Sequence, residues 1–140
     1  MIVLTVRPAT AADEPSVVAL WQACGLVVPH NDPVADFRFA RRGPNSDVLV
    51  GIDESGRVAG SVMVGHDGHR GWLYYVAADP DARGAGIGRK MASAAEDWLR
   101  ERGVRKVQLM IRETNTGVAE FYERVGYKTE PRVVMSKWLK

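Results

Sequence analysis

The 140-residue chain predicts an α/β (α+β) fold, in which a mixed, mostly antiparallel sheet of six to seven strands carries helices on both faces. Three observations lead to this prediction. Runs rich in β-branched and aromatic residues alternate with runs in which apolar residues recur every three to four positions. Short turns join three consecutive strands, which are therefore expected to be antiparallel neighbours. A helical crossover joins the next two strands, which the right-handed crossover rule makes parallel. The expected element order is β-α-α-β-β-β-α-β-α-β.

The first elements are a strand and two helices. Residues 2–7 predict a strand that ends at Pro8. Asp13 is expected to cap a helix whose inward face carries Val17, Leu20, Trp21 and Cys24 and which ends at Gly25. The sequence Asn31-Asp32-Pro33 predicts the start of a second helix over residues 34–42, whose basic end we interpret as solvated.

The central elements are three strands. Residues 48–53 and 57–66 flank the turn Asp53-Glu54-Ser55-Gly56, in which the glycine can supply a positive φ. A second turn leads to an aromatic and apolar strand over residues 71–78. Asp67 and His69 lie in this turn, and His66 lies directly before it. These short connections predict a meander of antiparallel strands.

The stretch from Asp79 to Arg89 links that strand to an amphipathic helix over residues 87–102. Its glycines allow successive backbone N–H groups to turn inward, and the following helix start presents unpaired N–H groups with a positive dipole end. Such a place can bind phosphate, although a tight turn with a helix cap is an alternative interpretation. The spacing Gly84-x-Gly86-x-Gly88 is not the dinucleotide fingerprint, and no Gly-Lys-Ser or Gly-Lys-Thr follows as in a nucleoside-triphosphate loop.

The last elements are a strand, a short helix and a final extended segment. Residues 106–111 predict a strand and residues 117–125 a helix. Residues 127–139 predict one long strand, or a hairpin broken at Pro131, which is why the expected strand count is six to seven. The apolar residues of this segment could pair with another copy of the chain, as in a homodimer, or cover a sheet edge; both interpretations stay open.

Composition and charge exclude several classes of protein. The length suits a single domain over residues 1–140, and 46% hydrophobic with 26% charged residues is ordinary for a globular chain. A net charge of +2 and the lack of a basic run argue against nucleic acid as a partner. No apolar run is long enough for a membrane span, no signal peptide is evident, and we expect a cytoplasmic protein. One cysteine and three scattered histidines predict no metal site.

Two blocks of sequence resemble the GNAT superfamily of N-acetyltransferases. The first, Arg83-Gly84-Ala85-Gly86-Ile87-Gly88, is similar to the pyrophosphate loop of that superfamily. The second is similar to its asparagine, Phe-Tyr helix and Gly-aromatic segment, in the stretch from Asn115 through Phe121-Tyr122 to Gly126-Tyr127. Finer detail resembles the bacterial YpeA-type branch, at Trp21, Cys24, Asn31-Asp32-Pro33 and Asp67-Gly68-His69-Arg70-Gly71.

The resemblance implies that acetyl-coenzyme A is the cosubstrate and a primary amine the acceptor. It implies that Arg83 and the N–H groups of Gly84, Ala85, Gly86, Ile87, Gly88 and Arg89 hold the pyrophosphate. It implies further that the strands on either side of the helix over 87–102 splay apart. The backbone of Val76, Ala77 and Ala78 would then hold the pantetheine arm, with the Val76 N–H stabilising the oxyanion.

The resemblance also implies roles for Tyr122 and Asn115 of the second block, and it leaves the base open. Tyr122 is expected to bind at the coenzyme sulfur and to return a proton to the leaving thiolate, although an aromatic on this helix face is also typical of packing. Asn115 is expected either to contact the coenzyme or to cap the helix. Glu113 is the favoured base, with Asp67, His66, His69 or a water chain as alternatives, because the strand over 71–78 lacks the glutamate of many relatives. That gap makes a non-catalytic acyl-coenzyme A sensor the competing hypothesis.

Overall fold

A computed structural model gives the fold of the chain and describes residues 3–82 and 84–140. The chain divides into two compact units, Met1–Leu109 and Met110–Lys140. Within the described residues no helix is both long enough and apolar enough to cross a bilayer.

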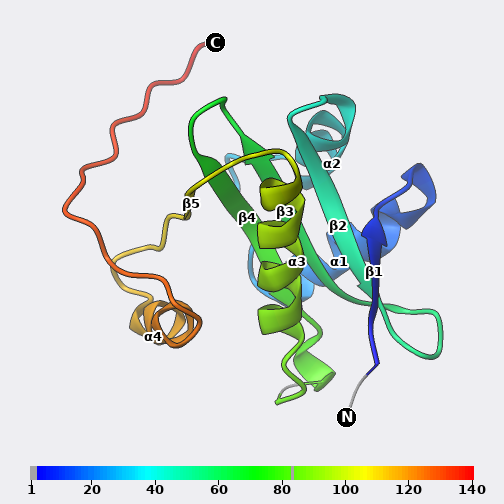
Figure 1. The fold of residues 1–140 in the computed structure, drawn as a ribbon. Coiled ribbons are helices and arrows are strands. Elements are labelled where there is room, and N and C mark those ends of the chain that lie inside the picture. The colour runs from blue at the N-terminus through cyan, green and yellow to red at the C-terminus, as the bar shows by residue number, and fades with distance from the viewer. Residues whose placement is uncertain (1–2, 83) are drawn as a thin grey trace. The chain divides into compact units, whose positions relative to one another are not determined.

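The first unit is built on a five-stranded sheet (Figure 1). Its strands lie in chain order: β1 Thr5–Pro8, β2 Ser46–Ile52, β3 Val58–His66, β4 Gly71–Ala78 and β5 Val107–Gln108. The first three pairings are antiparallel, and β4 pairs with β5 in parallel. The mixed, mostly antiparallel sheet and the parallel pair across the helical crossover are therefore confirmed.

Helices cover both faces of this sheet, as predicted. On one face lie α1 Glu14–Ala23 and α2 Pro33–Arg42, and on the other lies α3 Ile87–Glu101 (Figure 1). Two 3-10 turns, η1 Ala11–Asp13 and η2 Pro80–Ala82, precede α1 and follow β4. The core on the α1 and α2 side joins fully buried Trp21 and Phe37 to the strand residues Val48, Val50 and Ala77.

Helix α3 lies close to the sheet because glycines face it. A Cβ at Gly60 would come within 2.6 Å of Ile87 Cγ2, and one at Gly71 within 2.6 Å of Leu99 Cδ1. Either distance is far inside van der Waals contact, so only glycine permits this approach. Gly60 therefore fixes how the first turn of α3 lies on β3.

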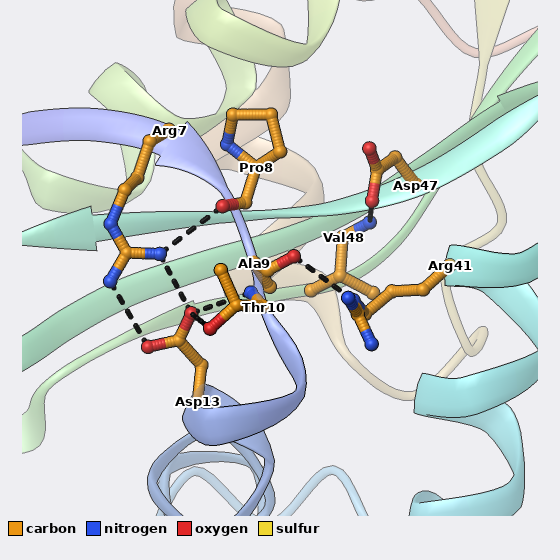
Figure 2. A network of polar contacts seen from close by, with 8 residues as sticks. All are labelled: Arg7, Pro8, Ala9, Thr10, Asp13, Arg41, Asp47 and Val48. Carbon is orange, nitrogen blue, oxygen red and sulfur yellow. Dashed lines mark hydrogen bonds and ion pairs between the residues drawn. The ribbon is translucent and has the colours of Figure 1, made fainter.

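The start of α1 corrects one prediction. Asp13 occupies the N-cap position, but its carboxylate makes no capping bond to α1. It accepts instead from both terminal nitrogens of Arg7, at 2.7 and 3.1 Å, and from the Thr10 N–H at 2.7 Å (Figure 2). The Arg7 guanidinium is the main cause that lowers the pKa of Asp13 to about 2. The side chain thus ties β1 to η1 rather than capping the start of α1. Nearby, Arg41 Nε donates to the Ala9 carbonyl at 3.0 Å (Figure 2), so one arginine of the basic α2 end has a structural contact.

The strand count of six to seven was too high, since the described residues form five. Strand β5 covers Val107–Gln108 rather than residues 106–111. In the second unit the only helix among the described residues is α4 Thr116–Arg124, and no strand is assigned to the described residues 127–139. The apolar side chains there are exposed, with Val133 at 87% and Leu139 at 93%. A strand needs a partner ladder as well as propensity, and the described residues 127–139 have no such ladder within their unit.

Candidate functional site

The glycine loop before α3 exposes backbone donors. Gly84 and Gly86 have φ values of 83° and 73°, and Gly86 is the N-cap of α3 without a side-chain cap. The first helical bond runs from Lys90 N–H to the Gly86 carbonyl at 3.1 Å, so the N–H groups of Ile87, Gly88 and Arg89 have no intrahelical acceptor. The Ala85 N–H, in contrast, donates to the Ala82 carbonyl at 3.3 Å. Arg83, the predicted charged contact, lies outside the described residues.

A second set of donors follows from an inversion of backbone phase within β4. The Gly71 N–H donates toward β5, to the Lys106 carbonyl at 2.8 Å, whereas the Asp79 N–H donates toward β3, to the Ala59 carbonyl at 2.8 Å. N–H directions alternate along a regular strand, so two odd-numbered residues should point to the same side. Their opposite directions mean that β4 contains one extra residue.

The pairing register locates this bulge. Pairing passes from Met63↔Tyr74 to Ser61↔Ala77, so that Tyr75 and Val76 together stand opposite one residue of β3. Tyr75 has φ 50° and is the only non-glycine residue with positive φ among the described residues. That conformation costs about 1–3 kcal/mol and persists only where the surroundings impose it.

The bulge turns the amides of Val76 and Ala78 toward an open strand edge. Pairing of β4 with β5 ends at Trp72 and Gln108, six positions before the end of β4 at Ala78. Beyond the bulge, the alternation sends the Val76 and Ala78 N–H groups to this edge. The Ala77 N–H, in contrast, points toward β3, where Ala77 pairs with Ser61, and the residue is buried. Pairing that stops after Trp72 is what the predicted splay of β4 and β5 requires, but only two of the three predicted residues aim their amides at the edge.

Together these donors suit an elongated ligand with amide groups and an anionic end. A free strand edge can hydrogen-bond the amides of an extended ligand as it would another strand. A helix N-terminus with a glycine loop attracts phosphate.

Sequence comparison agrees with this geometry. The sequence model of the acetyltransferase (GNAT) family matches residues 14–127. An acetyltransferase of Pectobacterium atrosepticum is 39% identical over 127 residues, which cover 91% of this chain and 89% of the relative. An acetyltransferase of Yersinia enterocolitica is 35% identical over 136 residues, covering 97% and 96%. The chain belongs to the GNAT acetyltransferase family. It is accordingly an acetyl-CoA-dependent N-acetyltransferase; the finer assignment to one branch stays a prediction.

Solved structures share the fold of this acetyltransferase. The enzyme AAC(6')-Iy, in complex with a bisubstrate analogue that contains coenzyme A, has a TM-score of 0.82 at 15% identity and covers 97% of this chain and 98% of that one. An acetyltransferase of Trypanosoma brucei has a TM-score of 0.76 at 24% identity, with coverage of 97% and 100%. At these identities the likeness concerns the fold alone.

Three predicted site residues lie in the second unit. Tyr122 is 8% exposed and packs edge-on against Phe121 and Tyr127, with ring centroids 5.0 and 5.5 Å away. Burial raises the pKa of Tyr122 to about 12, so the phenol is protonated at neutral pH. Asn115 is the N-cap of α4 and accepts from the Val118 N–H at 3.4 Å, which supports the capping interpretation. Glu113 is exposed in the turn before α4.

The turn between β3 and β4 holds two of the alternative bases, Asp67 and His66, in structural contacts. Asp67 accepts from the N–H groups of His69 and Arg70 at 2.9 and 2.8 Å, and these bonds lower its pKa. His66 Nδ1 accepts from the Gly68 N–H at 3.1 Å. Both side chains therefore stabilise the turn. In the described part of the chain, no three His, Cys, Asp or Glu side chains are grouped to hold a metal ion.

Sequence reasoning missed two contributors to this site. Gly60 sets the height of the α3 start above β3, and Tyr75 forms the bulge that inverts β4. The pair Tyr74-Tyr75 carries no signal for a bulge, because aromatic residues are ordinary in strands. The glycine of β3 could have suggested close packing against a helix, although not which helix.

Proposed function

We propose that the protein transfers the acetyl group of acetyl-CoA to a primary amine by direct attack on the thioester. The observation that carries this proposal is the series of backbone donors on one unit, from Val76 and Ala78 at the β4 edge to the Ile87, Gly88 and Arg89 amides. The first two bind the thioester oxygen and a pantetheine amide. The others bind the pyrophosphate, with Gly84, Gly86 and Arg83 completing the loop.

The transfer step needs no covalent enzyme intermediate. The neutral amine attacks the carbonyl carbon, a C–N bond forms, and the oxyanion is stabilised by the Val76 N–H. The C–S bond then breaks, and the thiolate takes a proton from the Tyr122 hydroxyl. The excess proton of the new amide nitrogen leaves to Glu113, directly or through water, and exchange of protons with solvent then restores the Tyr122 phenol and the Glu113 carboxylate. Oriented binding of both substrates supplies much of the acceleration.

The acceptor is a small amine, a protein N-terminus or a lysine. An α-amine has a pKa near 7.7–8.0 and a lysine near 10.4, so an α-amine needs less help to reach its reactive neutral form at pH 7. We place the reaction in the cytoplasm, where acetyl-CoA and such amines meet.

The competing hypothesis from the sequence, a non-catalytic acyl-CoA sensor, is disfavoured by membership of the acetyltransferase family and is kept only as an outcome of the turnover test. Strand β4, Gly71–Ala78, contains no glutamate, and His66 and Asp67 are engaged in the adjacent turn. In a sensor the backbone donors would remain while proton removal from an amine would be lost.

A melting experiment followed by a turnover assay tests both candidates. Acetyl-CoA at about 100 times its dissociation constant should add about 2.7 kcal/mol to the free energy of unfolding, which raises the melting temperature by several degrees. NAD and ATP serve as controls, and a shift with NAD alone would contradict the proposal. Thiol release is then measured with a panel of amines and free peptides. Binding without release above hydrolysis would support the sensor.

A further inference from the structure

The bulge residue Tyr75 is held at three points by three elements. Its ring stacks on Trp21 of α1, with centroids 3.9 Å apart and planes 10° apart. Its hydroxyl donates to Asp36 Oδ2 of α2 at 2.7 Å. Its carbonyl accepts from Ser61 Oγ of β3 at 3.3 Å.

Two of the residues that contact Tyr75 also contact each other. Trp21 Nε1 donates to Ser61 Oγ at 2.9 Å, so the indole supports both the ring and, through Ser61, the carbonyl of Tyr75. Trp21 and Ser61 are fully buried, and both therefore offer rigid supports. The hydrogen bond from the Tyr75 hydroxyl to Asp36 then fixes the direction in which the ring points.

We propose that Tyr75 is a positioning residue for acetyl transfer, which Asp36 and Trp21 hold so that the bulge aims the Val76 N–H at the thioester oxygen. The inference rests on the proposed function and goes beyond it by linking α1 and α2 to the polarisation of the carbonyl. A tyrosine with φ 50° does not keep this conformation unaided, and a relaxed β4 would return the Val76 amide toward β3. Coenzyme binding at the α3 start would survive such a change, but the carbonyl would lose its donor.

Three variants and one control separate positioning from general stability. Tyr75→Phe keeps the stack and removes the bond to Asp36, and Asp36→Ala removes the same bond from the other side. Asp36→Asn keeps an acceptor oxygen for the Tyr75 hydroxyl and should rescue. Ser46→Ala is the matched control, because it removes a hydrogen bond that also ties α2 to the sheet, from Ser46 Oγ to the Ala40 carbonyl at 2.8 Å, but at β2.

The readout is the carbonyl ¹³C signal of acetyl-CoA labelled at that carbon, bound to each variant. We expect a downfield shift in the wild type, in Asp36→Asn and in Ser46→Ala, and a clearly smaller shift in Tyr75→Phe and Asp36→Ala. The affinity for desulfo-CoA, which lacks the thioester, should stay unchanged in all. With an accepted amine, kcat of Tyr75→Phe should fall by about 10-fold, less than the 10²–10³ typical of losing an oxyanion donor entirely.

Three outcomes would overturn the inference: a wild-type shift that Tyr75→Phe retains in full, a decrease of the shift that Ser46→Ala shares, or a wild type that binds acetyl-CoA without a carbonyl shift. A wild type that binds neither acetyl-CoA nor desulfo-CoA would instead overturn the proposed function. If Asp36→Ala fails to fold, Tyr75→Phe with Asp36→Asn completes the test.

Discussion

Replacing Gly60 by alanine should displace the start of α3, which carries the backbone donors proposed to bind the coenzyme. The new Cβ would lie 2.6 Å from Ile87 Cγ2 and 2.9 Å from Met91 Cγ, so the first turn of α3 must move outward by about 1 Å to reach ordinary contact. Met91 can change rotamer, but Ile87 is β-branched, stiff and 2% exposed. Overpacking of this kind costs about 1–3 kcal/mol. Because Ile87 carries one of the free amides, affinity for acetyl-CoA should fall as well.

Gly71→Ala is the control for this prediction. Its Cβ would lie equally close, 2.6 Å, to Leu99 near the other end of α3. Thermal unfolding should show that both variants are destabilised, whereas calorimetric titration with acetyl-CoA should show weaker binding in Gly60→Ala alone. Equal losses of affinity in the two variants, or none in either, would refute the argument that the start of α3 is positioned by Gly60.

Three further predictions concern the loop, the acid and the N-terminal ion pair. Gly86→Ala should cost about 1–2 kcal/mol by thermal melting, since φ is 73° and a Cβ would meet no neighbour within 4 Å, and Gly86→Asn should cost less; equal costs would contradict a conformational origin. Tyr122→Phe should keep acetyl-CoA affinity and slow turnover by about 10²–10⁴, and unchanged kcat would remove the hydroxyl from the mechanism. The pKa of Asp13 is lowered from 3.8 to about 2, so its contribution is complete above pH 3.8 and disappears as pH falls to 2. Urea unfolding of Asp13→Asn should therefore show that the free energy of unfolding falls by about 1–2 kcal/mol at pH 7 and hardly at all near pH 2. This value is already reduced for solvent screening, because the Arg7 side chain is 41% exposed. A loss of stability that persists at pH 2 would contradict the ion-pair origin.

Local chemistry allowed several elements to be predicted from the sequence. Asp32 accepts from Val34 and Ala35 N–H at 3.0 and 3.2 Å, because an Asn-Asp-Pro sequence carries both the cap and the first-turn proline. The glycines Gly84 and Gly86 adopt the positive φ that their spacing indicated. These features depend on residues within a few positions of each other, which a single sequence displays.

Features that depend on distant partners were not predictable. Asp13 occupies the N-cap position of α1, yet its carboxylate pairs with Arg7, and nothing in the sequence ranks the two interactions. The segment over residues 127–139 has strand propensity and no ladder within its unit, because pairing is a property of two segments. The likeness to a family supplied the splay of β4 and β5, which periodicity could not show.

The phase inversion in β4 explains why the strand can serve two partners. Before the bulge, its outward amides complete the sheet with β5, as the Gly71 bond to Lys106 shows; after it, Val76 and Ala78 take over the outward positions. Without the extra residue, the alternation would turn the Ala77 amide to the strand edge and move its side chain off the face that packs beside Trp21 and Phe37. One inserted residue therefore keeps the Ala77 side chain in the core and brings the Val76 and Ala78 amides to the edge, in place of those of Tyr75 and Ala77. The strand ends at Ala78, and η2 (Pro80–Ala82) follows and leads to the glycine loop. The thioester donor and the phosphate donors therefore come from one continuous stretch of the chain.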